Sequence, residues 1–228
     1  MTRPWTIAID GPAGAGKSTV ARMLARRLGF LYIDTGAMYR AVALKAQRTG
    51  MPLSEPDGIA ALARAARIRF RAGTGGGEQR VFLDGEDVTE AIRAPEVAAH
   101  SSAVSAIPGV RSALVALQQT LGAQGGVVME GRDIGTVVFP NAEVKIFLTA
   151  SPSERAERRH KDLVARGTAA TLEEVRRDQD ERDWRDATRS VAPLAPAQDA
   201  VIIESDGLTP EDVVEEILAR IDARRRDA

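Results

Sequence analysis

The chain contains no cysteine, two histidines and only four lysines among its 31 basic residues. Without cysteine it can form no disulfide, no thiolate zinc site and no cysteine nucleophile. Its two histidines, His100 and His160, leave little material for a histidine metal cluster. A net charge of −1 gives no overall basic footprint for duplex nucleic acid. The composition therefore argues against disulfide scaffolds, metal centres built from thiols or imidazoles, and duplex-binding proteins.

Long hydrophobic runs are also missing, since none approaches the roughly 18 residues that a membrane span needs. The apolar run at Trp5 leads straight into a glycine loop, with no cleavage site of a signal peptide. Hydrophobic residues make up 44% of the chain and charged residues 28%, which is typical of folded globular proteins. We therefore expect a cytoplasmic protein, and the 228 residues suffice for roughly one to two domains.

Short apolar runs alternate with helical patterns along most of the chain. The expected strands are Trp5–Ile9, Phe30–Ile33, Val127–Met129, Val144–Leu148 and Ala200–Ile203. The expected helices are Lys17–Leu28, Gly36–Arg48, Val110–Leu121, Pro152–Arg166 and Pro210–Arg224. Strands that alternate with helices predict βαβ units and a parallel sheet.

Several helix ends carry their own signals. Ser151 and Glu154 have the spacing of a capping box, Thr171 and Glu174 repeat it, and Gly167 supplies a stop. Thr209 precedes Pro210 at the start of the last expected helix.

Two regions depart from the alternating pattern. Ile68–Val88 alternates weakly and contains the glycine run Gly75–Gly77, followed by Asp84-Gly85, a strong signal for a tight hairpin. We expect a small antiparallel β insertion there. Glu173–Arg189 is polar almost all round, which is typical of a helix that bridges solvent or belongs to a moving part.

A phosphate-binding loop follows the first expected strand. Residues 11–18 read GPAGAGKS, which fits G-x-x-x-x-G-K-[ST], and an expected helix follows. The backbone N–H groups of such a loop converge on phosphates at a helix N-terminus. Lys17 is expected to reach the β and γ phosphates, and the Ser18 hydroxyl is expected to bind Mg²⁺. The expected nucleotide-binding residues are Gly11, Pro12, Ala13, Gly14, Ala15, Gly16, Lys17, Ser18 and Thr19.

The loop predicts a nucleoside triphosphate but does not say how it is used. The chain has no Asn-Lys-x-Asp stretch for reading guanine, and it is too short for a motor or transporter ATPase. A small ATP-dependent kinase is the natural interpretation.

Of four further segments, the first resembles nucleoside monophosphate kinases in general, and the other three narrow the resemblance to the bacterial cytidylate kinases among them. The four segments are residues 34–40 (DTGAMYR), 104–111 (VSAIPGVR), 131–140 (GRDIGTVVFP) and 182–194 (RDWRDATRSVAPL). The resemblance covers essentially the whole chain, including the β insertion. It implies a P-loop α/β/α fold with a parallel core sheet, and transfer of the γ-phosphoryl group of Mg·ATP to CMP and dCMP. It also implies a single kinase domain, divided into a core (1–34, 108–150 and 192–228), a CMP-binding arm (35–107) and a lid (151–191).

The resemblance also implies roles for individual residues. Ser102, Arg111 and Asp133 would read the cytosine ring, and Arg40 would grip the acceptor phosphate. The whole implied substrate site is Thr35, Tyr39, Arg40, Ser102, Arg111, Arg132, Asp133, Arg182, Asp186 and Arg189. The implied catalytic residues are Lys17, Arg132, Arg158, Arg182 and Arg189, where Arg158 stands for one of three lid arginines with Arg155 and Arg159. The expected partners are ATP and CMP, with no nucleic acid or membrane, and the expected state is a monomer.

The residues support a site independently of the resemblance. Arg132 and Asp133 follow an expected buried strand, and ligands of parallel sheets bind at the carboxyl ends of strands. The alternative is a local Arg–Asp pair on the surface. Arg182, Asp186 and Arg189 would share one face of a continuous helix, although a solvated, ion-paired helix would show the same spacing.

Two other functions remain open from the residues. A P-loop kinase that phosphorylates a metabolite hydroxyl, such as shikimate or gluconate, would benefit from a carboxylate base near its acceptor. A non-catalytic ATP-binding switch would have no reason to carry the acceptor segments. The remaining conspicuous residues have simpler interpretations: surface or helix histidines, Trp5 and Trp184 as packing residues, and Arg224–Arg226 as a frayed helix end.

Overall fold

The computed structural model describes residues 4–71, 79–165 and 167–226, so the glycine run Gly75–Gly77 lies outside the described residues. The chain divides into two compact units, and we describe each by itself. Unit 1 comprises residues 1–32 and 124–228, and unit 2 comprises residues 33–123. Among the described residues, no helix combines the length and the apolar character needed to cross a membrane.

The five expected strands form one sheet, with the order β2-β6-β1-β7-β8. Their bounds are β1 Thr6–Asp10, β2 Leu31–Asp34, β6 Val127–Gly131, β7 Val144–Thr149 and β8 Val201–Glu204. The pairs β1–β6, β1–β7 and β7–β8 are parallel. Every residue of β1 is buried, as expected of a central parallel strand. Asp10, the last residue of β1, stands opposite Gly131, the last residue of β6, so the segments that follow both strands leave the sheet together.

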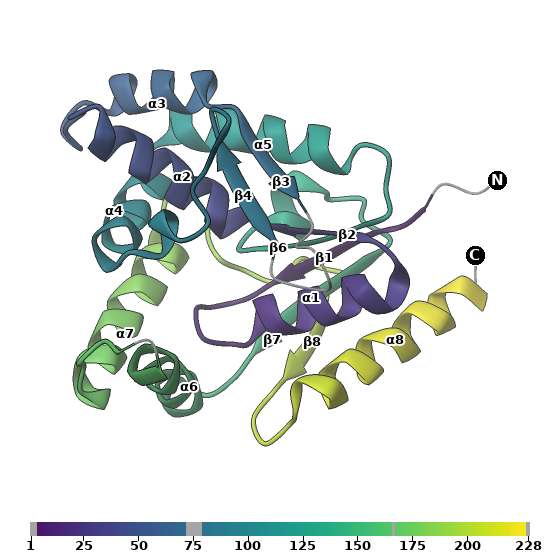
Figure 1. Ribbon diagram of the computed structural model, residues 1–228. Helices are drawn as coiled ribbons and strands as arrows, with labels where there is room; N and C mark the ends of the chain where they lie inside the picture. The colour runs from purple at the N-terminus through teal and green to yellow at the C-terminus, as the bar shows by residue number, and fades with distance from the viewer. Residues whose placement is uncertain (1–3, 72–78, 166, 227–228) are drawn as a thin grey trace. The chain divides into compact units, whose positions relative to one another are not determined.

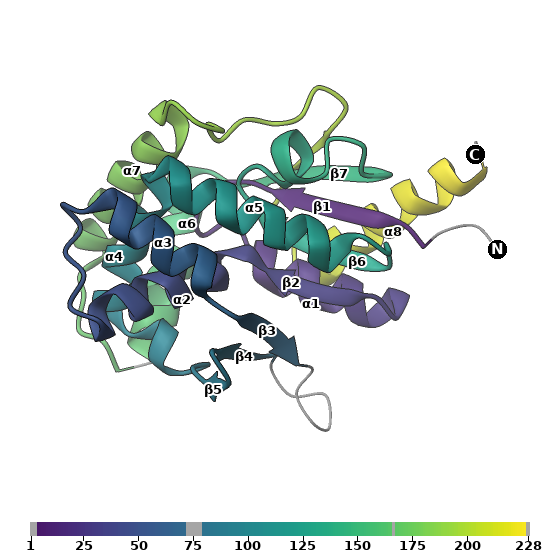
Figure 2. The same cartoon turned by 90° about the horizontal axis from the view of Figure 1, so that it is seen from above.

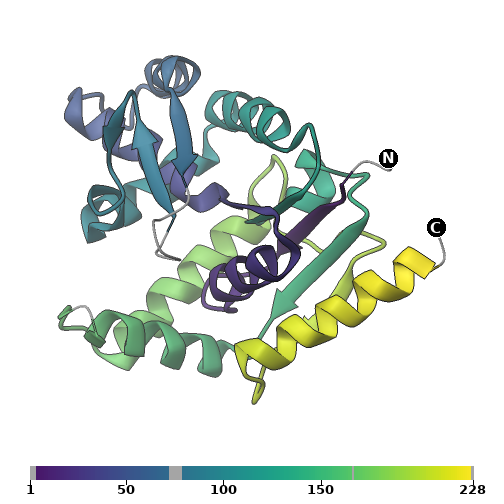
Figure 3. The ribbon, with the colours of Figure 1, turned by 45° about the vertical axis from the view of Figure 1, so that its right-hand side comes forward.

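The helices of unit 1 lie close to their expected positions. They are α1 Lys17–Leu28, α6 Pro152–Ala165, α7 Leu172–Thr188 and α8 Pro210–Arg226. Helices α1 and α8 lie side by side against the sheet (Figure 1). Their apolar residues, such as Leu24 and Ile217, share one core with Ile7 and Ile146 of the strands. Helices α6 and α7 pack against each other as a hairpin (Figure 3).

The helices α6, α7 and α8 begin at the expected capping residues, but at α6 one of the two expected hydrogen bonds goes to another residue. Thr171 and Glu174 form the full capping box of α7. Thr209 and Asp212 cap α8 in the same reciprocal way. At α6 only half of the box forms, because Ser151 accepts from the Glu154 N–H while its own N–H donates to Asp206.

Unit 2 contains the expected β insertion among four helices. The helices are α2 Thr35–Arg48, α3 Pro56–Ala65, α4 Pro95–Ala106 and α5 Pro108–Gly122, with a short 3₁₀ turn, η2, at Ala91–Arg93. The antiparallel sheet has the order β3-β4-β5 (Figure 2), with bounds Ile68–Arg71, Arg80–Leu83 and Glu86–Asp87. Asp84 and Gly85 join β4 to β5 with φ values of 53° and 99°, which confirms the predicted hairpin.

The structure also corrects some expectations. Helices α3 and α4 were not predicted: α3 is only 10 residues long and its buried face is mostly alanine, and the apolar residues of α4 are spread around the helix. Trp184 is 68% exposed and is not a packing residue, whereas Trp5 packs against the core. The terminal arginines continue α8 to Arg226, and the Arg225 guanidinium lies 5.3 Å from the centre of the Trp5 ring.

Candidate active site

The phosphate loop connects β1 to α1 under tight steric constraint. Gly11 has a φ of 146°, and a Cβ there would lie 1.9 Å from the carbonyl oxygen of Leu148 in β7. Gly14 has a φ of 79°, and a Cβ there would lie 2.9 Å from the carbonyl oxygen of Arg155 in α6. Both positions therefore require glycine, for space as well as for backbone conformation.

Lys17 is buried at the start of α1, and its Nζ donates a hydrogen bond to the carbonyl oxygen of Pro12 at 2.5 Å. Burial, together with the positive charges of Arg132 and Arg182, lowers the pKa of Lys17 to about 7. Glu130 and Asp10 act in the opposite direction and favour the ammonium form. A phosphate group at this place would supply the negative charge that these neighbouring cations call for.

Asp10 lies at the end of β1, immediately before the phosphate loop. Its two carboxylate oxygens accept hydrogen bonds from the backbone N–H groups of Ile134 at 2.8 Å and Gly135 at 2.7 Å. Burial raises the pKa of Asp10 to about 6, although these two hydrogen bonds lower it. The two bonds fasten the start of a π-helical turn, η3 (Ile134–Val138), to the central strand.

Arginines and acids gather beyond the end of β6. Arg132 Nε donates to Asp186 of α7 at 2.9 Å. The Arg189 guanidinium lies 3.8 Å from Asp133 and 3.9 Å from Asp186. Burial raises the pKa of Asp186, but the charges of Arg132, Arg182 and Arg189 outweigh it and hold that pKa below its usual value. Lys17, Arg132, Arg182 and Arg189 are four cations among four buried acids, Asp10, Glu130, Asp133 and Asp186, and the guanidinium groups have the geometry that suits phosphate oxygens.

These contacts differ from both alternatives that the spacing left open. Arg132 pairs with Asp186, 54 positions away, and not with the adjacent Asp133 as a local surface pair would. Asp133 and Asp186 are both buried, unlike the acids of a solvated helix. One detail of the expected helix is wrong: Arg189 does not continue α7, because it is the extended residue that caps its end.

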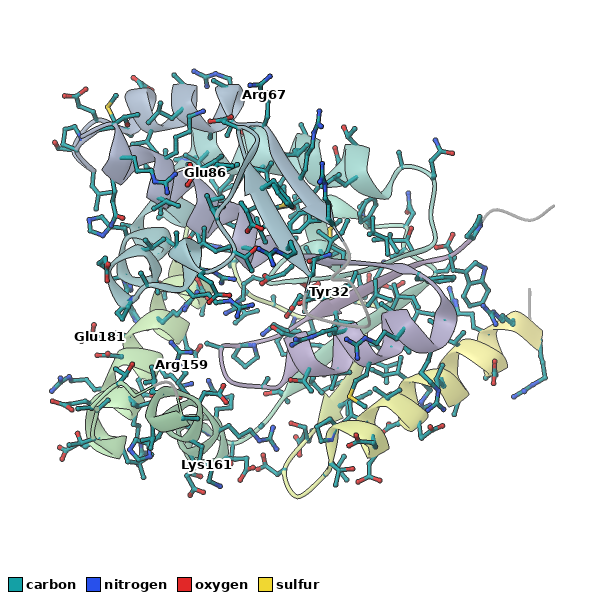
Figure 4. All side chains as sticks on the ribbon, in the orientation of Figure 1. Tyr32, Arg67, Glu86, Arg159, Lys161 and Glu181 are labelled. Carbon is teal, nitrogen blue, oxygen red and sulfur yellow. The ribbon has the colours of Figure 1, made fainter. Side chains whose placement is uncertain are left out.

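Glu130, the fourth residue of β6, is a buried acid that sequence reasoning missed. The hydroxyl of Tyr32 in β2 donates to its carboxylate, and Figure 4 labels Tyr32 near α1. The available signal for Glu130, as for Asp10, was an acid that directly follows an expected buried strand.

The three arginines of α6 have different surroundings. Arg155 is buried and donates to the carbonyl oxygens of Ala13 at 3.1 Å and Ala150 at 3.0 Å, and it pairs with Asp183 of α7. Arg158 is half-buried and donates to Ser205 Oγ at 2.8 Å and to Glu154 at 2.9 Å. Arg159 also lies on α6. Figure 4 labels it together with Glu181, which lies on the other helix of the hairpin, α7.

Arg155 therefore anchors the hairpin to the phosphate loop. Arg158 lies at the end of the loop, where a Cβ on Gly16 would be 3.9 Å from its guanidinium.

Unit 2 holds the other residues implied for the substrate site. Asp34 caps α2 by accepting from the Ala37 N–H at 3.0 Å, and it pairs with Arg40 at 2.8 Å. The Arg111 guanidinium lies 5.7 Å from the centre of the Tyr39 ring. Thr35 is buried at the start of α2, and Ser102 is half-buried on α4. Within this unit the structure thus brings together Asp34 with Arg40, and Tyr39 with Arg111.

The described residues include no group of three or more acids or histidines that could hold a metal ion. His100 contacts Gln47 and Glu96, and His160 contacts the carbonyl oxygen of Ala170, so both lie in ordinary helix surroundings. Ser18 is exposed on the first turn of α1.

Comparison with known proteins identifies relatives over nearly the whole chain. Residues 7–223 match the family model described as Cytidylate kinase. A cytidylate kinase of Pelotomaculum thermopropionicum is 56% identical over 221 residues, which cover 97% of each chain. A cytidylate kinase of Desulfitobacterium hafniense is 52% identical over 219 residues, 96% of this chain and 93% of that one.

A solved shikimate kinase from Bacteroides thetaiotaomicron has a TM-score of 0.50 and 14% identity, and the match covers 96% of this chain and 98% of that one. At this identity the likeness concerns the fold alone. It agrees with the predicted P-loop α/β fold, a parallel core sheet with flanking helices and a small antiparallel insertion, which is confirmed.

Proposed function

Because the chain belongs to the cytidylate kinase family, it phosphorylates CMP at the expense of ATP, and we propose that the phosphate loop and the arginine cluster of unit 1 carry out this transfer. The observation that carries the proposal is the phosphate loop itself, where the backbone is held against Leu148 at Gly11 and Lys17 is buried at the start of α1 with Arg132 and Arg182 as neighbouring charges. The two arginines act on Lys17 as neighbouring positive charges, and the phosphates of a nucleotide would complement all three cations.

The reaction needs no general base. The acceptor is a phosphate oxygen of CMP, and the second pKa of a phosphate ester is about 6, so this oxygen is largely ionised at pH 7. It attacks the γ-phosphorus of ATP, the bond from that phosphorus to the β,γ-bridging oxygen breaks, and CDP and ADP result. Catalysis then consists of positioning and charge stabilisation. We assign that stabilisation to Lys17 and to the arginines at 132, 158, 182 and 189.

A magnesium ion fits the residues present as a partner of the nucleotide. Mg²⁺ in kinase sites keeps several waters and binds substrate phosphates with few protein ligands. The exposed Ser18 hydroxyl is an oxygen donor beside the phosphate loop, and a cage of acids is absent from the described residues. We propose that Ser18 holds the ion, which would neutralise developing charge on the phosphates.

CMP recognition is the second part of the proposal. Asp133 would accept from the exocyclic amino group of cytosine, together with Ser102 and Arg111 at the base, and Arg40 and Thr35 at the phosphate. We further propose that residues 35–107 form the CMP-binding arm and residues 151–191 the lid. The protein would act as a cytoplasmic monomer on small molecules, with dCMP as a second acceptor.

The test is an ADP-release assay with purified protein, ATP and Mg²⁺, across CMP, dCMP, UMP, AMP, GMP and shikimate. We expect turnover with CMP and dCMP far above the others. Turnover with shikimate alone would point to a metabolite kinase, and ATP binding without turnover on any acceptor would point to a switch.

A further inference from the structure

The π-helical turn η3 follows Asp133, and the first backbone N–H groups of this turn do not take part in its internal hydrogen bonds. A helical turn leaves its first N–H groups without intrahelical partners. In η3 these are the N–H groups of Ile134 and Gly135, and the carboxylate of Asp10 accepts from both. The turn itself closes onto Asp133, whose carbonyl oxygen accepts from the N–H of Val137 at 2.9 Å. Asp10 thus caps, from another strand, the turn that starts at Asp133.

Asp10 also stands at a junction of the chain. The phosphate loop starts at the next residue, Gly11, while Asp133 directly precedes the two N–H groups that Asp10 holds. Asp10 therefore belongs to the strand that ends at the phosphate loop, and its carboxylate binds the segment that we propose recognises CMP.

We propose that Asp10 is a positioning residue, which fixes the Arg132–Asp133 segment relative to the phosphate loop and thereby sets the discrimination between CMP and UMP. This inference rests on the proposed function of Asp133. Asp10 would touch neither substrate, and it would act only through the backbone of residues 133–135.

The chemistry of the contact requires a carboxylate. Two N–H donors need two acceptor oxygens, and a carboxylate offers acceptors only. An asparagine would keep one oxygen and turn its NH₂ group toward the second N–H, which would leave two donors facing each other. At pH 7 the group is mainly ionised despite burial, because its pKa is about 6.

The surroundings leave the turn little freedom to compensate. A Cβ on Gly135 would lie 3.2 Å from Lys145 Cδ and 3.4 Å from Asp10 Oδ2, so these two side chains fill the space beside this residue. The ammonium of Lys145 donates to the carbonyl oxygen of Pro140 and to Asp199 at 2.8 Å, which holds the far end of the same segment. Release at Asp10 would therefore shift the near end, where Asp133 lies.

The experiment compares kcat/KM for CMP and UMP in the wild type, Asp10→Asn, Asp133→Ala and the double variant. We expect Asp10→Asn to lower kcat/KM for CMP by about tenfold to 10²-fold, the range that a displacement of reacting groups costs. The loss with UMP is expected to be at least about fivefold smaller, because UMP gains little from a well-placed Asp133. In the Asp133→Ala background, Asp10→Asn is expected to leave the CMP-to-UMP ratio unchanged.

Two further variants guard the interpretation. Asp212→Asn removes a carboxylate that likewise accepts from a backbone N–H, but at the start of α8, and it is expected to leave the ratio unchanged. Gly135→Ala adds a methyl group 3.2 Å from Lys145 Cδ and 3.4 Å from Asp10 Oδ2, which crowds the turn while Asp10 stays in place, and it is expected to lower the CMP-to-UMP ratio of kcat/KM even if Asp10→Asn does not fold.

Equal losses on CMP and UMP in Asp10→Asn, or additive effects on the ratio in the double variant, would overturn the inference and leave Asp10 a stability residue. A wild-type enzyme that does not prefer CMP would instead contradict the proposed function. The two failures are therefore distinguishable.

Discussion

The guanidinium of Arg155 donates a hydrogen bond to the carbonyl oxygen of Ala13 at 3.1 Å, and so ties helix α6 to the middle of the phosphate loop. The same guanidinium pairs with Asp183, so that α7 is joined to this contact as well. A single buried side chain therefore holds the loop and both helices of the hairpin.

Arg155→Ala is expected to damage both stability and ATP binding. Removing one partner of a buried ion pair costs on the order of 3 kcal/mol, because the other charge stays buried without compensation. The loop also loses a support at Ala13, so we expect KM for ATP to rise more than KM for CMP. Urea unfolding and steady-state kinetics measure the two effects. Arg176→Ala is the control, since Arg176 lies 4.0 Å from Asp180 with both side chains more than half exposed, and it is expected to change stability by less than about 1 kcal/mol.

Lys17→Met is expected to separate activity from stability. The loss of a preorganised charge on the phosphates would lower kcat by about 10²-fold or more. Methionine also removes a buried ammonium that burial and two arginines disfavour, so the Tm of the ligand-free variant is expected to equal or exceed that of the wild type. A variant with near wild-type kcat would contradict the catalytic assignment, and a much lower Tm would contradict the account of its electrostatics.

Asp133→Ala is expected to relax the choice of base. A carboxylate accepts from the amino group of cytosine and repels the carbonyl oxygen of uracil at the same ring position. A good polar contact to a base edge is worth about 1–3 kcal/mol of discrimination, which corresponds to roughly 5- to 150-fold in kcat/KM. The loss is expected mainly with CMP, measured against UMP. Similar losses on both would mean that Asp133 serves the phosphates or the fold, and the choice of base would then rest on Ser102, Arg111 or Thr35.

Asp10 is expected to make stability depend on pH in the acid range. Its folded-state pKa of about 6 lies above the usual 3.8, so between these values the folded protein binds more protons than the unfolded chain. The contribution of Asp10 to stability therefore falls as the pH rises from about 4 to 6, by up to about 3 kcal/mol, and is constant above about pH 7.

Other carboxylates titrate in the same range, so the quantity to measure is the free energy of unfolding of the wild type minus that of Asp10→Asn. This difference is expected to decrease from pH 4 to pH 6, because only the wild type loses the contribution of protonated Asp10. A difference that stays flat over this interval would show that Asp10 has an ordinary pKa in the folded protein.

Much of the fold could be predicted because its signals are local. The strands are apolar runs next to glycine loops, and the caps at Thr171 and Thr209 are set by residues three positions apart. The phosphate loop is similarly contained within eight residues. By contrast, the apolar face of α3 is short and mostly alanine, α4 has no apolar stripe, and Trp184 lies in a polar helix whose packing no local pattern determines.

The candidate site was predicted only where side chains cluster along the chain. The bond between Arg132 and Asp186 spans 54 positions, and that between Asp10 and Ile134 spans 124. Such partners depend on the strand order, which places β6 beside β1. Arg155 contacts the phosphate loop and Arg158 contacts Ser205 because of how α6 is rotated against its neighbours, which the sequence alone does not determine.

The contact of Gly11 with β7 has a consequence for the thermodynamics of nucleotide binding. Because the backbone there lies directly on the Leu148 carbonyl group, the loop takes its course when β1 and β7 pair. The conformational entropy of this part of the loop is therefore lost during folding, and ATP does not have to order it again on each binding event. Less conformational entropy is therefore lost when ATP binds, and the free energy of binding is more favourable than it would be for a flexible loop.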